Sequence, residues 1–465
     1  MNLLVDRRTV GVIGIQQSGK STFITSLIHH LRCHDPAVFP LGDGRRRIQF
    51  LRNLPESGGI PAFPYTRYRY DLHEGRWPRK TTSLSEYRCR LRLSASIQSK
   101  MKRNALRVTE LTLIDIPGER LADLGIAAAG YPEWSDALLK LLDDHPSYRD
   151  TSTAFRDLLD SAQPFDSVRL IEEFKRMLAR LAFRGLPCIT PSTLLITPQG
   201  KYVPREICEK QDANALAELH FAGISGEAEF APLSARARST NPALLKKFEQ
   251  NYRLYRRTIV DPLAQRLYSC DQLLVLVDIP TLLAGGQDVF NGCLHVIEES
   301  LRYLAPGRFL WTAGLDLALS VMTGGRKRLR GRFGRSSLRQ IAFVAAQADR
   351  VHCKDHDKLG ELARQMIEPH LDELADRRVD AQFFVCSAVN STESKDYSFI
   401  EAVPLGQQAP VQIEVSPVPD LWPRRGWTPG QFRFPTIAPE PSPLLLHPPN
   451  QFGLERVASF MLGIT

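Results

Sequence analysis

The sequence predicts an α/β fold: a mostly parallel β-sheet flanked by helices, with a large helical insertion between the two halves of the sheet. Three observations support this prediction. Short apolar segments typical of buried strands recur along the chain, a helical pattern directly follows the first of them, and amphipathic helical patterns occupy the long middle region. With 465 residues, 43% hydrophobic and 24% charged, the chain can form several structural units and has the composition of a globular protein.

Composition excludes several other classes of protein. No segment approaches the roughly 18 consecutive apolar residues that a membrane-spanning helix needs, and the first residues lack the order of a secretory signal. The eight cysteines are scattered and, like the eleven histidines, show no zinc-ligand spacing, so we expect reduced thiols in a cytoplasmic protein. The neighbouring His29 and His30 are expected on the surface of a helix. The formal net charge of +9 is compatible with an acidic partner or surface.

The strongest functional signal is a glycine-rich loop after the first predicted strand, residues 9–13. Its pattern is Gly-x4-Gly-Lys-Ser and it opens a predicted helix, which is typical of a P-loop nucleoside triphosphatase. Glycines allow backbone N–H groups to surround phosphate oxygens, and the helix N-terminus adds partial positive charge. Lys20 is expected to reach the β- and γ-phosphates, and the Ser21 hydroxyl to ligate Mg²⁺. The predicted nucleotide-binding residues of the loop are Gly14, Gln17, Ser18, Gly19, Lys20, Ser21 and Thr22.

A magnesium-binding acid is predicted at the end of the apolar strand 108–114. There Asp115 begins an Asp-x-x-Gly sequence, and we expect it to hold the metal through a water molecule. The N–H of Gly118 would meet the γ-phosphate, so this residue would sense hydrolysis. Just upstream, residues 87–93 alternate with the period of a half-exposed strand. The two strands are therefore expected to form a hairpin, the order of elements found in switch GTPases.

The catalytic residues are predicted around this hairpin. Thr81, with Thr82 as the alternative, is expected to give a second hydroxyl to magnesium when triphosphate is bound. Glu119 occupies the position of a water-orienting glutamine, but an ionised glutamate donates no hydrogen bond and repels the γ-phosphate. We therefore expect slow intrinsic hydrolysis, helped by charge from Arg120, from the switch arginines or from a partner. The predicted catalytic residues are Lys20, Thr81, Gly118 and Glu119, and the predicted metal ligands are Ser21, Thr81 and Asp115.

A guanine pocket is predicted after the apolar strand 341–345. Asp349 lies where a carboxylate would accept hydrogen bonds from N1–H and N2–H of guanine, a pair of donors that adenine lacks. The usual element is Asn/Thr-Lys-x-Asp, but this chain has Ala346 and Gln347 at the first two positions, which weakens the argument for specificity. Ser387 and Ala388 follow the last predicted strand and are expected to contact O6 of the base. The predicted base-side residues are Gln347, Asp349, Ser387 and Ala388.

These motifs together resemble those of the YcjX-like P-loop GTPases, a bacterial family associated with membrane and heat stress. The resemblance extends along essentially the whole chain and is specific at residues 14–21, 115–120, 131–135, 252–255 and Asp349. It departs at Gln347, where that family tends to carry lysine. The resemblance implies a GTPase fold with a large helical insertion, hydrolysis of GTP with Mg²⁺, and a membrane-protein neighbour in a stress response.

The spacing of the motifs predicts how the chain is divided. Asp349 follows Asp115 by 234 residues (349 − 115), which leaves room for an inserted body of well over a hundred residues. We expect a first part of the GTPase domain at 1–120, a mainly helical insertion at 121–267, the base-binding second part at 268–400, and a proline-rich extension at 401–465 that packs a terminal helix on the core.

Smaller features support this division. Amphipathic patterns predict a helix over 167–183, after Asp166 as its N-cap, and a second helical run that ends near Pro262. Asp278 is expected to cap the helix after strand 272–277, with a supporting role at the nucleotide site as the alternative. Residues 404–449 hold 12 of the 32 prolines, so this segment is expected to run extended before a helix near 454–462.

A basic segment, residues 326–339, contains seven lysines and arginines and no acid. A solvated loop is the simplest interpretation, and contact with anionic lipid or an acidic partner is the sharper one. Nucleic acid is a third, but no recognisable binding module accompanies the charge, so no specific nucleic acid is expected.

The function predicted from the sequence is that of a Mg²⁺-dependent switch protein that hydrolyses GTP slowly to GDP and phosphate. A module that uses nucleotide to control binding of a partner, with little or no hydrolysis, is the alternative, and an ATPase is the third candidate. The expected partners are GTP or GDP and a membrane-associated stress protein. The expected location is the cytoplasm, with the inner face of the membrane as a peripheral site.

Overall fold

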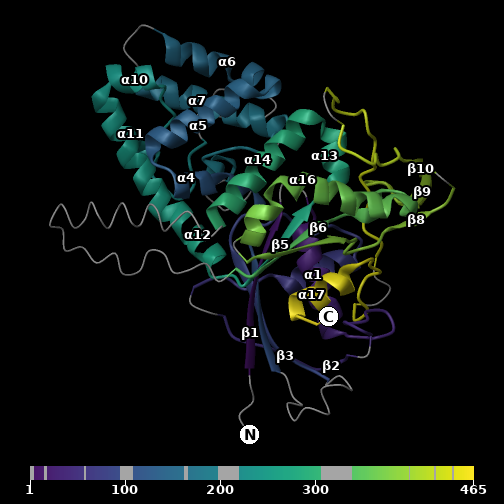
Figure 1. Ribbon diagram of the computed structural model, residues 1–465. Helices are drawn as coiled ribbons and strands as arrows, with labels where there is room; N and C mark the ends of the chain where they lie inside the picture. Colours follow the sequence, from purple (N-terminus) through teal and green to yellow (C-terminus); the bar gives the residue numbers. More distant parts are fainter. Residues whose placement is uncertain are drawn as a thin grey trace.

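The computed structural model contains a seven-stranded β-sheet in the order β2-β3-β4-β1-β5-β6-β7 (Figure 1). Strands β4, β1, β5, β6 and β7 are parallel to one another, whereas β3 is antiparallel to both β2 and β4. The predicted α/β fold with a mostly parallel sheet is therefore confirmed. The strands are β1 (Val5–Gly14), β2 (Ile48–Asn53), β3 (Ser85–Leu93), β4 (Val108–Asp115), β5 (Gln272–Val277), β6 (Gln340–Ala345) and β7 (Asp380–Val385).

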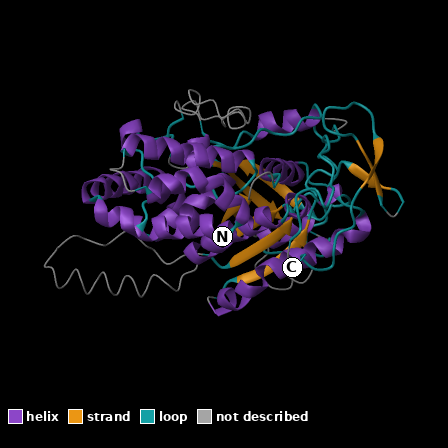
Figure 2. Cartoon of the chain, turned by 90° about the horizontal axis from the view of Figure 1, so that it is seen from above, coloured by secondary structure: helices purple, strands orange, loops and turns teal. Residues whose placement is uncertain are grey.

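A second, three-stranded sheet follows β7 in the chain, in the order β10-β9-β8. Its strands are β8 (Thr392–Ser394), β9 (Phe399–Ala402) and β10 (Val411–Glu414). Figure 2 shows this small sheet at the opposite end of the molecule from the large group of helices. The structure describes residues 5–14, 18–44, 46–56, 59–94, 108–161, 166–196, 219–304, 338–376, 378–396, 398–423, 426–441 and 445–464.

The large sheet is buried on both faces, which explains its nearly continuous apolar strands. In β5, Leu273 and Val275 pack into one hydrophobic core, while Leu274 and Leu276 point into the other. The side-chain period of two thus divides one apolar strand between two cores. All five parallel strands end at the same edge of the sheet, so the loops that follow β1, β4, β5, β6 and β7 gather there.

Helices from distant parts of the chain cover the two faces. One face carries α1 (Lys20–Arg32), α2 (Tyr65–His73) and the terminal helix α17 (Leu454–Leu462). The other carries α13 (Ile279–Gly285), α14 (Gln287–Leu304), α16 (His356–Asp376) and the helices between β4 and β5. The latter are α4 (Leu124–Ala128), α5 (Tyr131–Asp144), α6 (Pro146–Asp160), α7 (Ser167–Phe183), α10 (Ala235–Thr240), α11 (Pro242–Tyr255) and α12 (Asp261–Tyr268).

Two helix predictions in this region had different outcomes. Helix α7 has the predicted bounds, and the Asp166 carboxylate accepts a hydrogen bond from the Val168 N–H as its cap. The prediction that the second helical run ends near Pro262 was wrong. A π-helical segment, Arg256–Val260, joins α11 to α12, and Pro262 lies in the first turn of α12. Pro262 has no backbone N–H, so it removes one hydrogen bond from this otherwise continuous helical run without ending it.

The surface position expected for His29 and His30 was also wrong, because both side chains are buried. The terminal segment of the chain covers this part of α1. His30 Nε2 lies 3.1 Å from the Pro449 carbonyl oxygen, and its ring stacks on Phe39 at 4.6 Å. Burial lowers the pKa of both imidazoles to about 4, so both are neutral at pH 7.

Two further predictions concern membranes and thiols. Within the described ranges, no helix combines the length and apolar character required to cross a bilayer. The basic segment 326–339 lies outside the described residues except at its last two positions. The expected free thiols are found at all cysteines that the structure describes; Cys208 is not among them.

Candidate functional site

The glycine-rich loop joins β1 to α1 at the carboxyl edge of the sheet. Gly14 ends β1, and a Cβ atom there would overlap the Ser18 hydroxyl and lie 3.3 Å from Leu276 Cβ, so this tightly packed position favours glycine. Gly19 caps α1 with φ of 72°, a left-handed conformation that glycine adopts without strain. Lys20 begins α1, whose first N–H groups have no partner within the helix and can bind an anion. The predicted contact Gln17 lies outside the described residues.

Three oxygen-bearing side chains from separate segments meet beside this loop. Ser21 Oγ is 2.9 Å from Thr81 Oγ1, and the Thr81 hydroxyl donates to Asp115 Oδ2 at 2.8 Å. Asp115 is almost fully buried at the end of β4 and forms an ion pair with the Lys20 ammonium. Two hydroxyls and a carboxylate are hard oxygen ligands of the kind that Mg²⁺ prefers. The three residues therefore have the right chemistry for a magnesium site.

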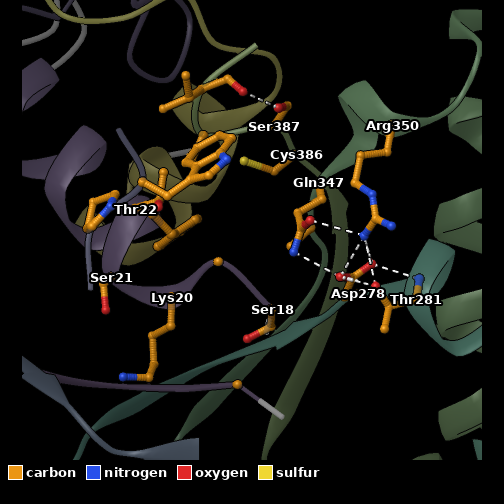
Figure 3. Close-up of a pocket in the computed structure, with 18 of the residues that line it drawn as sticks. Ser18, Lys20, Ser21, Thr22, Asp278, Thr281, Gln347, Arg350, Cys386 and Ser387 are labelled. Atoms are coloured by element: carbon orange, nitrogen blue, oxygen red, sulfur yellow. Dashed lines mark hydrogen bonds and ion pairs between the residues drawn. The ribbon is translucent and has the colours of Figure 1, made fainter. Parts of the chain in front are cut away.

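Lys20, Ser21 and Thr81 line a cavity of about 460 Å³, a volume in the range of ligand-binding pockets. Asp115 lies behind them and is hydrogen-bonded to Thr81. Figure 3 shows Lys20 and Ser21 on one side of the cavity and Gln347, Asp278 and Arg350 on the other. Every predicted nucleotide contact that the structure describes lines this cavity. They are Gly14, Ser18, Gly19, Lys20, Ser21, Thr22, Gln347, Asp349, Ser387 and Ala388. Thr81, Gly118 and Glu119 line it as well.

The glutamate after the Asp-x-x-Gly sequence has a cationic partner. Glu119 Oε1 lies 2.6 Å from Lys80 Nζ, and Glu119 is mostly buried while Lys80 is half exposed. Lys80 immediately precedes Thr81, so the ion pair joins the two segments that border the predicted position of the γ-phosphate. Arg120, considered from the sequence as a source of charge, instead donates to the Ile259 carbonyl at 3.0 Å, toward the helical insertion.

On the base side, Asp349 lies in a short 3-10 turn after β6 and is 5% exposed. Burial raises the pKa of its carboxyl group to about 6, partly offset by hydrogen bonds from Ser387 and Ser391. The Ser387 N–H donates to the Phe452 carbonyl at 2.8 Å, so one of the two N–H groups predicted to contact O6 already has a hydrogen-bond partner. Among the contacts that the structure describes, the Ala388 N–H donates no such bond.

Hydrogen bonds to neighbouring residues hold the Gln347 side chain in place. Its backbone is left-handed, with φ of 57°, and its side-chain amide donates to Asp278 Oδ2 at 2.9 Å. Arg350 Nη1 contacts Asp278 Oδ2 at 3.0 Å and Gln347 Oε1 at 3.2 Å. The Asp278 carboxylate also accepts from the N–H and hydroxyl of Thr281 and so caps α13. Asp278 therefore has both of the roles considered for it: it caps a helix and supports the pocket.

Gln347 also approaches the phosphate-binding loop. A Cβ atom on Gly19 would lie 3.7 Å from Gln347 Nε2, which is ordinary contact distance. The base-side segment after β6 and the loop after β1 therefore meet at these two residues.

Several residues of the cavity were missed by the sequence analysis. Lys80 precedes Thr81 and Arg350 follows Asp349. A positive charge next to a predicted site residue was a signal by which both could have been predicted to line the cavity. Trp77 could have been chosen as an aromatic residue in a switch segment. Thr436 and Ile437 also line the cavity, but they lie in the proline-rich extension, where no motif points to a ligand.

Comparison with known proteins places this chain in a family. A model of the YcjX-like family, DUF463, matches residues 9–464. The protein called Ras-like GTPase YcjX from Escherichia coli (strain K12) is 24% identical over 465 residues, which cover 95% of this chain and 92% of the relative. The protein of the same name from Shewanella oneidensis is 24% identical over 318 residues, 63% of each chain. The resemblance predicted from the motifs is confirmed, and the chain belongs to the YcjX-like family, whose curated relatives are named as Ras-like GTPases.

Proposed function

We propose that this protein is a Mg²⁺-dependent nucleotide switch that binds GTP and hydrolyses it slowly to GDP and phosphate. One observation carries the proposal. A single cavity is lined by a glycine-rich loop with its lysine, by the hydroxyls of Ser21 and Thr81, and by a buried carboxylate suited to guanine, and Thr81 is hydrogen-bonded to the Asp115 carboxylate. The loop, Asp115 and Asp349 come from the ends of the parallel strands β1, β4 and β6, the usual position of a ligand in an open α/β sheet, and Thr81 comes from the segment before β3.

The residues of the loop would bind the phosphates. Backbone N–H groups at the start of α1 and the Lys20 ammonium would neutralise charge on the β- and γ-phosphates. Ser21 and Thr81 would hold Mg²⁺ through their hydroxyl oxygens and Asp115 through a water molecule; bound there, the metal would neutralise further phosphate charge. The Asp115 carboxylate now pairs with Lys20, and phosphate would offer this lysine a competing anion.

The base side favours guanine. Ionised Asp349 would accept the N1–H and N2–H hydrogen bonds, and the Ala388 N–H would donate to O6. Gln347 would lie against the base, because Asp278 and Arg350 hold its side chain beside the phosphate-binding loop. Adenine would leave the Asp349 carboxylate without its two donors, at the cost of an unsatisfied buried acceptor.

Slow hydrolysis follows from Glu119. Its carboxylate cannot donate a hydrogen bond to the γ-phosphate, and it is already paired with Lys80. The same pair favours the second candidate function, a nucleotide-controlled interaction module with little or no hydrolysis. The role in membrane and heat stress, and a membrane-associated partner, remain predictions from the family resemblance.

Titration with fluorescent GDP and ADP in the presence of Mg²⁺ tests nucleotide choice. We expect GDP to bind at least tenfold more tightly than ADP, since discrimination based on unsatisfied buried polar groups is large. Lys20→Ala should lose binding of both, because the phosphates lose their cation. Equal affinity for the two nucleotides would contradict guanine specificity, and unchanged binding by Lys20→Ala would contradict the whole site.

Single-turnover phosphate release from bound GTP separates the two candidate functions. A switch GTPase should release phosphate in a Mg²⁺-dependent manner, at a rate that Thr81→Ala lowers by tenfold or more. An interaction module should bind GTP and retain it unhydrolysed. A fast basal rate would contradict the inferred effect of Glu119.

A further inference from the structure

The proline-rich extension reaches the cavity through a segment that we call the strap, residues 435–437. Thr436 and Ile437 line the cavity, and Ile437 is itself 4% exposed. Figure 1 shows the yellow C-terminal segment passing from the small sheet toward α17. The strap is thus part of the cavity wall, although it is more than eighty residues beyond the guanine-binding motif.

The strap is bonded to both walls of the cavity. On one side, the indole N–H of Trp77 donates to the Ile437 carbonyl at 2.7 Å. On the other, Arg350 Nε donates to the Pro435 carbonyl at 3.0 Å, next to Asp349. Trp77 lies four residues before Thr81, in the predicted switch segment. The three residues of the strap therefore connect the switch segment to the base-side segment across one side of the cavity.

Backbone hydrogen bonds also join the strap to the turn that follows β9. The Leu405 N–H donates to the Thr436 carbonyl at 3.0 Å, and the Ala438 N–H donates to the Val403 carbonyl at 2.8 Å, so the strap pairs with the turn after β9. Pro441, four residues after the strap, also approaches the switch side. Gly75, with φ of 68°, lies so close to the tail that an added Cβ would be 3.1 Å from Pro441.

The chemistry of the strap suits the nucleoside part of a nucleotide. The phosphate-binding residues lie at the Lys20 end of the cavity, whereas the strap contacts Arg350 beside Asp349. Ile437, Trp77 and Pro78 present apolar and aromatic surface to the cavity. Such surface is complementary to a base and a ribose rather than to phosphate.

We propose that the strap is a nucleotide-retaining element. With Trp77 it closes the nucleoside side of the pocket, so bound guanine nucleotide is released only when the Trp77–Ile437 hydrogen bond opens. This inference rests on the proposed function, because it takes a guanine nucleotide as the occupant. It gives the proline-rich extension a part in nucleotide binding, although none of the nucleotide-binding motifs lies in that extension.

The test is the rate at which excess GDP displaces a fluorescent GDP from wild type and from Trp77→Phe. Phenylalanine keeps an aromatic ring but removes the indole donor, so the rate should rise about fivefold, the effect of one lost hydrogen bond of about 1 kcal/mol. Trp422→Phe is the matched control. It removes an indole bond to the Leu362 carbonyl at 2.8 Å, away from the cavity, and should leave the rate within twofold of wild type.

Hydrogen exchange provides a second measurement. The Ala438 N–H next to the strap donates to the Val403 carbonyl. Bound GDP should slow hydrogen exchange of this amide in wild type, and should slow it less in Trp77→Phe. The inference is overturned if Trp77→Phe and Trp422→Phe lose GDP at equal rates and GDP does not protect Ala438. If wild type still binds GDP in that case, the proposed function stands. Wild type that binds no more GDP than Lys20→Ala would overturn both.

Discussion

Glu119 and Lys80 place one negative and one positive charge at the cavity. Their ion pair spans 2.6 Å between the segment after β4 and the segment before β3. A γ-phosphate bound near Gly118 would face a carboxylate whose charge is balanced by this lysine. Lys80 is therefore a cation placed to offset the glutamate in the part of the chain that the structure describes, whereas the sequence suggested Arg120 as a source of charge.

The pair predicts a compensation between two substitutions. Lys80→Met should slow single-turnover hydrolysis about tenfold, because Glu119 loses this cation and repels the γ-phosphate more strongly. Glu119→Gln in the same chain should restore the rate to wild type or above, since no carboxylate remains to be balanced. Lys246→Met, on the exposed surface of α11, is the control and should have no effect. Failure of the double variant to recover would show that Lys80 acts in another way.

If the proposed guanine contact is made, Asp349 should make nucleotide binding depend on pH. Burial raises its pKa to about 6, and guanine requires the ionised carboxylate. The affinity for GDP should be nearly constant above pH 7 and should fall by up to tenfold per pH unit below 6, as a proton must leave on binding. Calorimetric titration from pH 5 to 8 measures this. Asp349→Asn should bind weakly, and its residual pH dependence reports the ionisation of the nucleotide itself.

At the scale of elements, the 3-10 helix Gly118–Asp123 connects the cavity to the helical insertion, because it begins at one and ends in the other. Asp123 is fully buried and accepts hydrogen bonds from Thr190 Oγ1 at 2.9 Å, Ser192 Oγ at 2.6 Å and Tyr255 OH at 2.7 Å. Burial raises the pKa of the Asp123 carboxyl group, and these donors oppose the change. A displacement of Gly118 would therefore reach α11 through only a few bonded residues.

Tyr255→Phe tests the strength of this connection. Loss of the hydroxyl leaves the buried Asp123 carboxylate with one donor fewer, which should lower the free energy of unfolding by about 1–3 kcal/mol. Tyr70→Phe is the control, because Tyr70 is 51% exposed, and should change stability by less than about 0.5 kcal/mol. Urea denaturation of the two variants measures the difference. Equal stabilities would show that the Tyr255 hydroxyl contributes nothing.

For the whole molecule, the two ends of the chain stabilise each other. Helix α17 packs on the face of the sheet that also carries α1, and Arg8 Nη1 of β1 donates to the Met461 carbonyl at 3.2 Å. Leu454, Val457 and Leu462 are buried in this core. The last residues of the chain are thus part of the core that supports the phosphate-binding loop.

Leu462→Ala should therefore be costly even though it lies so near the C-terminus. Removal of a buried leucine should lower the free energy of unfolding by about 2–5 kcal/mol. Leu446→Ala, in the same extension but 70% exposed, should be nearly neutral. Thermal unfolding of the two variants would distinguish them, and a neutral Leu462→Ala would contradict the packing of α17.

Features that depend on neighbouring residues could be predicted without coordinates. The strands β4 and β5, the helix α7 and the glycine-rich loop follow from apolar period, capping and backbone freedom, all of which act over a few residues. Long-range contacts could not be predicted in this way. Trp77 and Ile437 are 360 positions apart, and His29 and His30 are buried because the far end of the chain covers them. Such contacts depend on how all the apolar faces pack at once, and no short stretch of sequence contains that information.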